Sequence, residues 1–112
     1  MSPITTHILD THRGCPAAGV QIVLREQKDG IFQPIASGKT NEDGRLPGLL
    51  AEGTLRPGIY QMYFATEAYH ASLGIKGFYP EVVVTFEIVH TDQHYHIPLL
   101  LSPFGYSTYR GS

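Results

Sequence analysis

The chain has 112 residues, of which 42% are hydrophobic and 16% charged, and its formal net charge is -2. This length suits one domain with a single buried core, and the composition is too apolar for a disordered chain. Lysine and arginine are scattered singly, which excludes the clustered basic face that nucleic acids require. We therefore expect a single domain over residues 1–112 that binds no nucleic acid.

The N-terminal segment and the cysteine content bear on location. The first ten residues, MSPITTHILD, lack the basic and apolar regions of a signal peptide, and no later run approaches the ~20 apolar residues of a membrane span. The single cysteine, Cys15, cannot form an internal disulfide. We expect a soluble cytoplasmic protein without membrane contacts. The alternatives are a peroxisomal location, or a periplasmic one after removal of a signal peptide.

Most of the chain shows the two-residue alternation of β-strands. Asp29-Gly30 has the composition of a hairpin turn, and Gly44 suits the positive φ of a second turn over residues 41–45. The pattern and turn density predict an all-β fold, an antiparallel β-sandwich of about seven or eight short strands. The segments that carry this pattern are residues 20–26, 32–40, 58–65, 81–89 and 94–102.

One segment, TEAYHASLG over residues 66–74, predicts a short helix. Thr66 is its expected N-cap, Glu67 suits the first turn, and Gly74 is a C-terminal stop signal. Three aromatic residues are expected to pack at this corner rather than to bind a ligand, namely Tyr69, Phe78 and Tyr79.

Six histidines are present, and three of them lie in HTDQHYH, residues 90–96. On a strand, residues two apart face the same way. The continuous apolar set is expected in the core and comprises Tyr95, Ile97, Leu99 and Leu101. His94 and His96 are therefore expected to point outward, toward water or toward another subunit.

Two alternatives remain open for this histidine pair. A His-x-His strand occurs in zinc sites, with His7 as a further ligand and Asp10 as a weaker one. No cysteine pair, HExxH motif or carboxylate cluster supports a metal, so we predict none. The other alternative is that these are exposed strand histidines without a function.

Three stretches resemble the transthyretin-related 5-hydroxyisourate hydrolases: ITTHILDTHRGCPAAGVQIVL, TNEDGR and the C-terminal HYHIPLLLSPFGYSTYRGS. The resemblance spans nearly the whole chain. It implies a transthyretin-like sandwich with one short helix, assembled as a homotetramer with sites at the subunit interfaces. It also implies hydrolysis of 5-hydroxyisourate to 2-oxo-4-hydroxy-4-carboxy-5-ureidoimidazoline in urate degradation, without a cofactor.

The resemblance also implies the site residues. They are His7, Arg45 and His96 as catalytic residues, and Tyr109, Arg110, Gly111 and Ser112 as substrate-binding residues. Opening a cyclic amide with water requires a base, a cation for the oxyanion and a donor for the leaving nitrogen. Two histidines and an arginine supply these groups, and which histidine is the base stays open at this point.

Two other classes of function compete with hydrolysis. A transthyretin-like hormone-binding protein would carry apolar side chains where this chain offers His7, Arg45 and His96. A structural or partner-binding sandwich needs neither the histidine pair nor a charged tail. We expect the tail to fold back over the face that carries His96, with a neighbouring subunit completing the burial.

Overall fold

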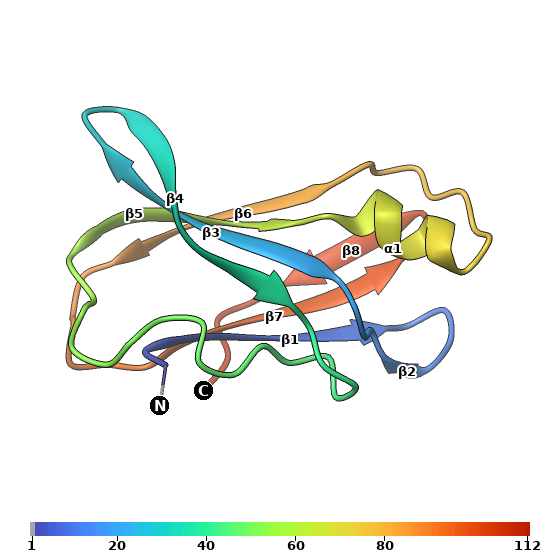
Figure 1. The fold of residues 1–112 in the computed structure, drawn as a ribbon, viewed down its shortest axis with the longest axis horizontal. Coiled ribbons are helices and arrows are strands. Elements are labelled where there is room, and N and C mark those ends of the chain that lie inside the picture. The colour runs from blue at the N-terminus through green and yellow to red at the C-terminus, as the bar shows by residue number, and fades with distance from the viewer. Residues whose placement is uncertain (1) are drawn as a thin grey trace.

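Two four-stranded sheets pack face to face, with one short helix at an end, in the computed structural model, which describes residues 2–112 (Figure 1). The first sheet has the strand order β2 (Cys15–Pro16), β1 (Ile4–Asp10), β7 (Tyr95–Ser102), β8 (Gly105–Thr108). The second has the order β4 (Ile31–Lys39), β3 (Gln21–Lys28), β5 (Gly58–Phe64), β6 (Val82–Ile88). The expected sandwich of about eight strands is confirmed.

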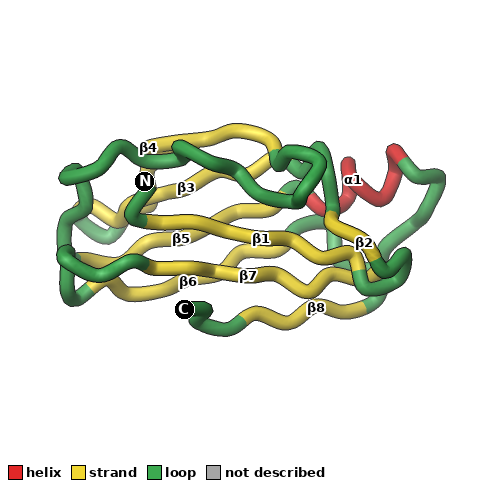
Figure 2. The backbone as a smooth tube through the Cα atoms, turned by 90° about the horizontal axis from the view of Figure 1, so that it is seen from below, coloured by secondary structure: helices red, strands yellow, loops and turns green. Residues whose placement is uncertain are grey.

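The expectation of purely antiparallel strands was wrong for one pair. β1 and β7 run parallel, with Thr5 opposite His96 and His7 opposite Pro98. Parallel neighbours need a long crossover connection. The segment that connects β1 to β7 supplies this crossover, because it forms the second sheet before it returns to the first. β1 and β7 lie side by side in Figure 2.

The core fills the space between the sheets. Side chains at alternate positions of β1 and β7 point inward, and the predicted core residues Tyr95, Ile97, Leu99 and Leu101 are all buried. They pack in one cluster with the inner face of the second sheet, which includes Ile22, Leu24, Tyr60, Met62 and Phe64. This apolar cluster fixes the register of β7, so that His96 lies on the opposite, outer face.

Both predicted turns are present. Asp29 and Gly30 have φ values of 52° and 77°, the positive pair that a two-residue hairpin turn requires. Gly44 has a φ of 73°, and its carbonyl accepts a 2.9 Å hydrogen bond from the N–H of Ile8. A Cβ atom at Gly44 would collide with the carbonyl oxygen of Ile8, so a glycine is needed for this loop to lie against β1.

The helix α1 (Thr66–Ser72) begins one residue earlier than expected, because Thr66 is its first helical residue and not its N-cap. Ala65 is the N-cap, without a side-chain capping bond, so the assignment of Thr66 to this role was wrong. The Thr66 hydroxyl instead donates to the carbonyl of Tyr79 at 3.3 Å. The predicted stop at Gly74 is confirmed by a φ of 71°. No helix within residues 2–112 is long and apolar enough to cross a membrane.

The aromatic corner differs in part from the expectation. Tyr69 is buried, but Phe78 is 69% exposed and therefore does not pack in the corner of this chain. The rings of Phe78 and Tyr79 meet edge to face, and Tyr79 meets Tyr106 of β8 in the same way. The result is an exposed aromatic band beside the edge strand β8.

A buried carboxylate links α1 to the end of β1. Asp10 accepts hydrogen bonds from the Tyr69 hydroxyl at 2.7 Å and from the backbone N–H groups of His12 and Arg13 at 3.0 Å. Burial alone would raise the pKa of Asp10, but these hydrogen bonds and the Arg13 charge outweigh it and lower the pKa. Burial and the bond to Asp10 raise the pKa of Tyr69 to about 12. The charged carboxylate is therefore the stabilising form.

We predict that this carboxylate makes stability depend on acid pH. Because the pKa of Asp10 is lower in the folded state, its contribution is present above the unfolded value of about 3.9 and is lost as the pH falls through the folded value. Asp10→Asn should lower the free energy of unfolding at pH 7 by about 1–3 kcal/mol and flatten this acid dependence. Urea unfolding over a pH series measures both, with the exposed Asp92→Asn as the control. Equal acid dependence in the Asp10→Asn variant would contradict the assignment.

Candidate functional site

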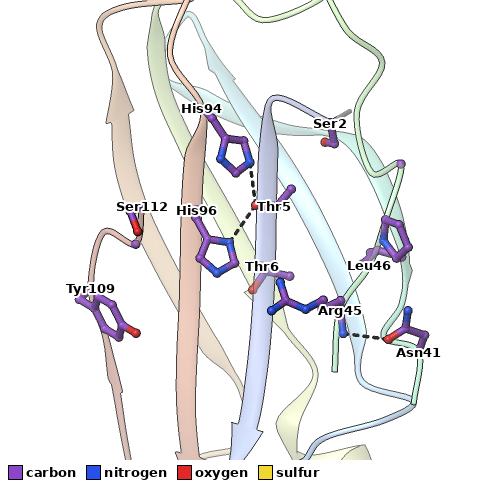
Figure 3. A pocket seen from close by; sticks show the side chains of 13 residues that line it. Ser2, Thr5, Thr6, Asn41, Arg45, Leu46, His94, His96, Tyr109 and Ser112 are labelled. Carbon is purple, nitrogen blue, oxygen red and sulfur yellow. Dashed lines mark hydrogen bonds between the residues drawn. The ribbon is translucent and has the colours of Figure 1, made fainter. Parts of the chain in front are cut away.

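A cavity of about 570 Å³ lies on the outer face of the first sheet (Figure 3). Three segments far apart in sequence form it: the N-terminal part with β1, the loop after β4, and the start of β7 with the C-terminal tail. The lining residues are Ser2, Thr5, Thr6, Asn41, Arg45, Leu46, Pro47, Gly48, His94, His96, Tyr109, Gly111 and Ser112. The parallel pairing of β1 and β7 thus brings both chain ends to one site.

His96 lies half-buried at the centre of this cavity. Its Nδ1 atom is hydrogen-bonded to Oγ1 of Thr5 at 2.8 Å, and the same hydroxyl is bonded to Nε2 of His94 at 2.9 Å. The two imidazole rings are nearly parallel, with their centroids 6.3 Å apart. Figure 3 shows Thr5 between the two rings. The orientation of His96 is therefore fixed by a neighbouring strand.

The pKa of His96 is lower than that of an ordinary histidine. Burial is the largest cause, followed by the positive charge of Arg45 and then by His94 and His7, while hydrogen bonding to Thr5 acts in the opposite direction. A histidine with a lowered pKa is neutral at pH 7. His96 can therefore accept a proton from a group in the cavity.

Arg45 is exposed and follows the turn that Gly44 permits. Asn41 fixes this turn: its backbone N–H donates to the Arg45 carbonyl at 2.7 Å, and its side-chain Oδ1 accepts from the Arg45 N–H at 3.1 Å. Figure 3 shows the guanidinium group turned toward His96. A cation and a neutral base thus share one cavity.

His7 lies beside this cavity and is not among its lining residues. It is half-buried on the outer side of β1, and an isolated antiparallel bridge pairs it with Arg45. Its charge contributes to the lowered pKa of His96. The structure therefore brings the three predicted catalytic residues close together, with Arg45 and His96 lining the cavity and His7 beside it.

The tail returns along β7 and lies against His96. The N–H of Gly111 donates to the His96 carbonyl at 2.9 Å, and a Cβ at Gly111 would lie 2.5 Å from Cδ2 of the imidazole. Tyr109 and Ser112 line the cavity on either side of this contact. A glycine at position 111 therefore allows the tail to cover one edge of the ring.

Arg110 is the predicted substrate-binding residue that points elsewhere. Its guanidinium carbon lies 4.4 Å from the centroid of the Tyr95 ring, and its Nη2 donates to Gln93 at 3.0 Å. It borders a separate cavity of about 270 Å³ between the edges of the two sheets. In the single chain, Tyr109, Gly111 and Ser112 thus face the site, while Arg110 does not.

Sequence reasoning missed Thr5 and the part played by Asn41. A signal for Thr5 existed, because it alternates with His7 and so shares its face of the first strand. The link between Thr5 and His96 depends on the parallel register of β1 and β7, which sets the two residues opposite each other. Asn41 was visible as a turn residue whose side chain can bond the following backbone.

A bound metal ion would need three or more ligand side chains grouped around one point. No group of three or more His, Cys, Asp or Glu side chains that could hold a metal ion occurs within the described part of the chain, residues 2–112. His94 and His96 share the hydroxyl of Thr5 instead.

Comparison with known proteins places this geometry in a family. A family model described as HIUase/Transthyretin family matches residues 4–111. The chain belongs to the HIUase/Transthyretin family. It is 46% identical over 109 residues to the 5-hydroxyisourate hydrolase of Salmonella dublin, a match that covers 97% of this chain and 80% of that protein.

The solved structures similar to this chain include both a transthyretin and a 5-hydroxyisourate hydrolase. Sea bream transthyretin in complex with thyroxine superposes with a TM-score of 0.93 at 33% identity, covering 97% of this chain and 94% of that one. The 5-hydroxyisourate hydrolase of Klebsiella pneumoniae gives 0.85 at 34% identity, with coverage of 97% and 98%. The shared backbone does not separate the two functions, so the site residues must.

We predict that Gly111→Ala raises the pKa of His96 toward its ordinary value. The added methyl group cannot fit beside Cδ2, so the tail must move away and let water reach the ring, which removes the largest cause of the lowered pKa. Gly105→Ala is the matched control, because its Cβ would meet only the Ser102 hydroxyl at 3.8 Å. NMR titration of the His96 ring measures the change. The same pKa in Gly111→Ala and wild type would refute this role of the tail.

Proposed function

We propose that the protein hydrolyses 5-hydroxyisourate to 2-oxo-4-hydroxy-4-carboxy-5-ureidoimidazoline. The relatives named above as hydrolases, at 46% and 34% identity over nearly the whole chain, support this activity. The observation that carries it is the pairing, in one cavity, of a half-buried histidine of lowered pKa with an arginine guanidinium. Hydrolysis of a cyclic amide needs these two groups.

The cavity supports a mechanism with His96 as the base. His96 accepts, at Nε2, one proton of a water molecule whose oxygen forms a bond to the amide carbonyl carbon. The guanidinium group of Arg45 stabilises the negative charge that develops on the carbonyl oxygen. When the carbon–nitrogen bond breaks, His96 returns the proton to the leaving nitrogen. One water molecule is consumed, and no cofactor is needed.

The other predicted residues support these two groups. His7 pairs with Arg45 through the backbone bridge, and its charge helps to keep His96 neutral. Tyr109, Gly111 and Ser112 bound the substrate space beside His96. Arg110 can reach the substrate only if it leaves the Tyr95 ring when the subunits assemble.

The competing function is small-molecule binding without catalysis. Sea bream transthyretin, which has the same fold, was solved in complex with thyroxine. The polar side chains in this cavity, Arg45, His94 and His96, favour an oxygen-rich substrate over an apolar hormone. Thyroxine binding together with an unchanged decay of 5-hydroxyisourate would select the carrier.

We predict that the protein accelerates the decay of 5-hydroxyisourate generated in the cuvette from urate and urate oxidase, followed by ultraviolet absorbance. His96→Ala and Arg45→Ala should each lower the rate by about 10²–10³-fold, because each removes a group that acts on the reacting atoms. Arg25→Ala, on the outer face of the second sheet, is the control and should keep the wild-type rate. Wild-type rates in both site variants would overturn the mechanism.

The assembly is also a proposal: we infer a homotetramer with the sites at subunit interfaces. Large apolar side chains are exposed next to the edge strand β8, with Phe78 69%, Phe104 74% and Tyr106 42% exposed. Exposed aromatic groups of this density mark association surfaces. A neighbouring copy on this surface would cover the tail, whose cavity-lining residues Tyr109 and Ser112 are exposed in the single chain.

We predict that the double variant Phe78→Ser, Phe104→Ser dissociates into smaller species. Both changes remove exposed apolar area, so they should weaken association while leaving the core of each chain intact. Sedimentation velocity measures the mass, and circular dichroism checks the fold. The exposed Val89→Ser, away from the aromatic band, is the control. A wild-type sedimentation coefficient for the double variant would contradict the placement of the interface.

A further inference from the structure

The Thr5 hydroxyl is hydrogen-bonded to both histidines of the cavity. Its Oγ1 lies 2.8 Å from Nδ1 of His96 and 2.9 Å from Nε2 of His94. A hydroxyl group carries one hydrogen and two acceptor lone pairs, so it donates to at most one ring nitrogen and accepts from the other, or accepts from both. The tautomers of the two rings are therefore coupled through one oxygen atom.

His96 can act as a base toward the cavity only if Thr5 accepts a hydrogen bond from its Nδ1. If Thr5 donates to His96 Nδ1, the proton of the neutral ring lies on Nε2, and that nitrogen cannot accept another. If Thr5 donates to His94 Nε2, His96 donates from Nδ1 and keeps a free electron pair on Nε2. The hydrogen bond of the His96 ring to Thr5 uses Nδ1, and no residue in 2–112 is hydrogen-bonded to Nε2.

The two histidines differ in exposure. His96 is half-buried beside the positive charge of Arg45, whereas His94 is exposed and can be solvated when charged. The charged and titratable groups on the cavity side of His96 are Arg45, His7, His94, Tyr109 and the carboxylate of Ser112. Those around the second cavity that it borders are Glu87, Tyr95, Tyr109 and Arg110. Burial and the charge of Arg45 thus destabilise a positive charge on His96.

We propose that Thr5 and His94 form a proton relay that serves His96, an inference that rests on the proposed hydrolysis. When His96 Nε2 takes a proton from water, its Nδ1 proton passes to Thr5 Oγ1, and the Thr5 proton passes to His94 Nε2. His96 becomes neutral again, with its proton on Nε2, and His94 carries the positive charge. Departure of the leaving nitrogen draws the Nε2 proton of His96, and the relay runs back to its starting state.

This relay makes Thr5 a positioning residue and His94 a store for the charge. The positive charge moves from a site next to Arg45 to a solvated ring whose centroid is 6.3 Å away. Without the relay, the intermediate state holds two cations, His96 and Arg45, side by side. Loss of either relay residue should therefore slow turnover more than it weakens substrate binding.

The test combines three variants in the 5-hydroxyisourate assay. Thr5→Val removes the hydroxyl at nearly constant shape and should lower kcat about tenfold with little change in KM, whereas Thr5→Ser should retain the wild-type rate. His94→Ala should lower kcat to a similar extent and be rescued by free imidazole in the buffer. Imidazole should not rescue Thr5→Val, in which the path to His96 is broken.

The controls separate the relay from simple structural damage. Thr11→Val removes a hydroxyl bonded to the Leu101 carbonyl at 3.1 Å, at the other end of the same strand pair. His90→Gln removes an exposed imidazole from the loop before β7. Both should keep wild-type kcat, and urea unfolding shows whether Thr5→Val is folded at the assay temperature.

A measurement that needs no substrate tests the ground state. The ¹⁵N chemical shifts of the His96 ring should show the proton on Nδ1 in the wild type and a shift of population to Nε2 in Thr5→Val. Failure of the wild type to hydrolyse 5-hydroxyisourate would refute the proposed function while leaving these shifts as predicted. Wild-type kcat in Thr5→Val or His94→Ala, or His94→Ala unresponsive to imidazole, would overturn the relay.

Discussion

The parallel pairing of β1 with β7 is the constraint on which the site depends. It joins residues about ninety positions apart, sets Thr5 opposite His96, and brings His7 to the same outer face. Its register is fixed from the other side of the sheet, where alternate residues of both strands enter the core. A slip by one residue would turn the histidines inward and expose the apolar set. The same strand register is thus required both for the stability of the core and for the geometry of the site.

Two glycines then bring the remaining parts of the site to this strand pair. Gly44 lets the loop after β4 lie against β1, which carries Arg45 to the cavity. Gly111 lets the tail lie against the edge of the His96 ring. The burial that results lowers the pKa of His96, and the nearby guanidinium lowers it further. A histidine kept neutral next to a cation is suited to accept a proton from water while the cation stabilises an oxyanion.

Much of this architecture could be predicted from the sequence, because the information is local. Alternation in residues 94–102 predicts which side chains of β7 are buried, and Asp29-Gly30 predicts the hairpin with its two positive φ values. The parallel pair was not predicted, since strand direction depends on the path of the whole chain. The capping role of Thr66 was wrong because its hydroxyl bonds to a carbonyl brought near by tertiary packing. Thr5 was missed for the same reason: its partners lie 89 and 91 residues away.

The most direct test of the account compares two values for one group. NMR titration gives the pKa of the His96 ring, and the acid side of the profile of kcat/KM against pH gives the pKa of the group that must be unprotonated in the free enzyme. The account predicts that the two values agree and lie below the ordinary histidine value, because burial and Arg45 disfavour the imidazolium form. A rate profile whose acid limb does not follow the titration of His96 would contradict the assignment of this residue as the base.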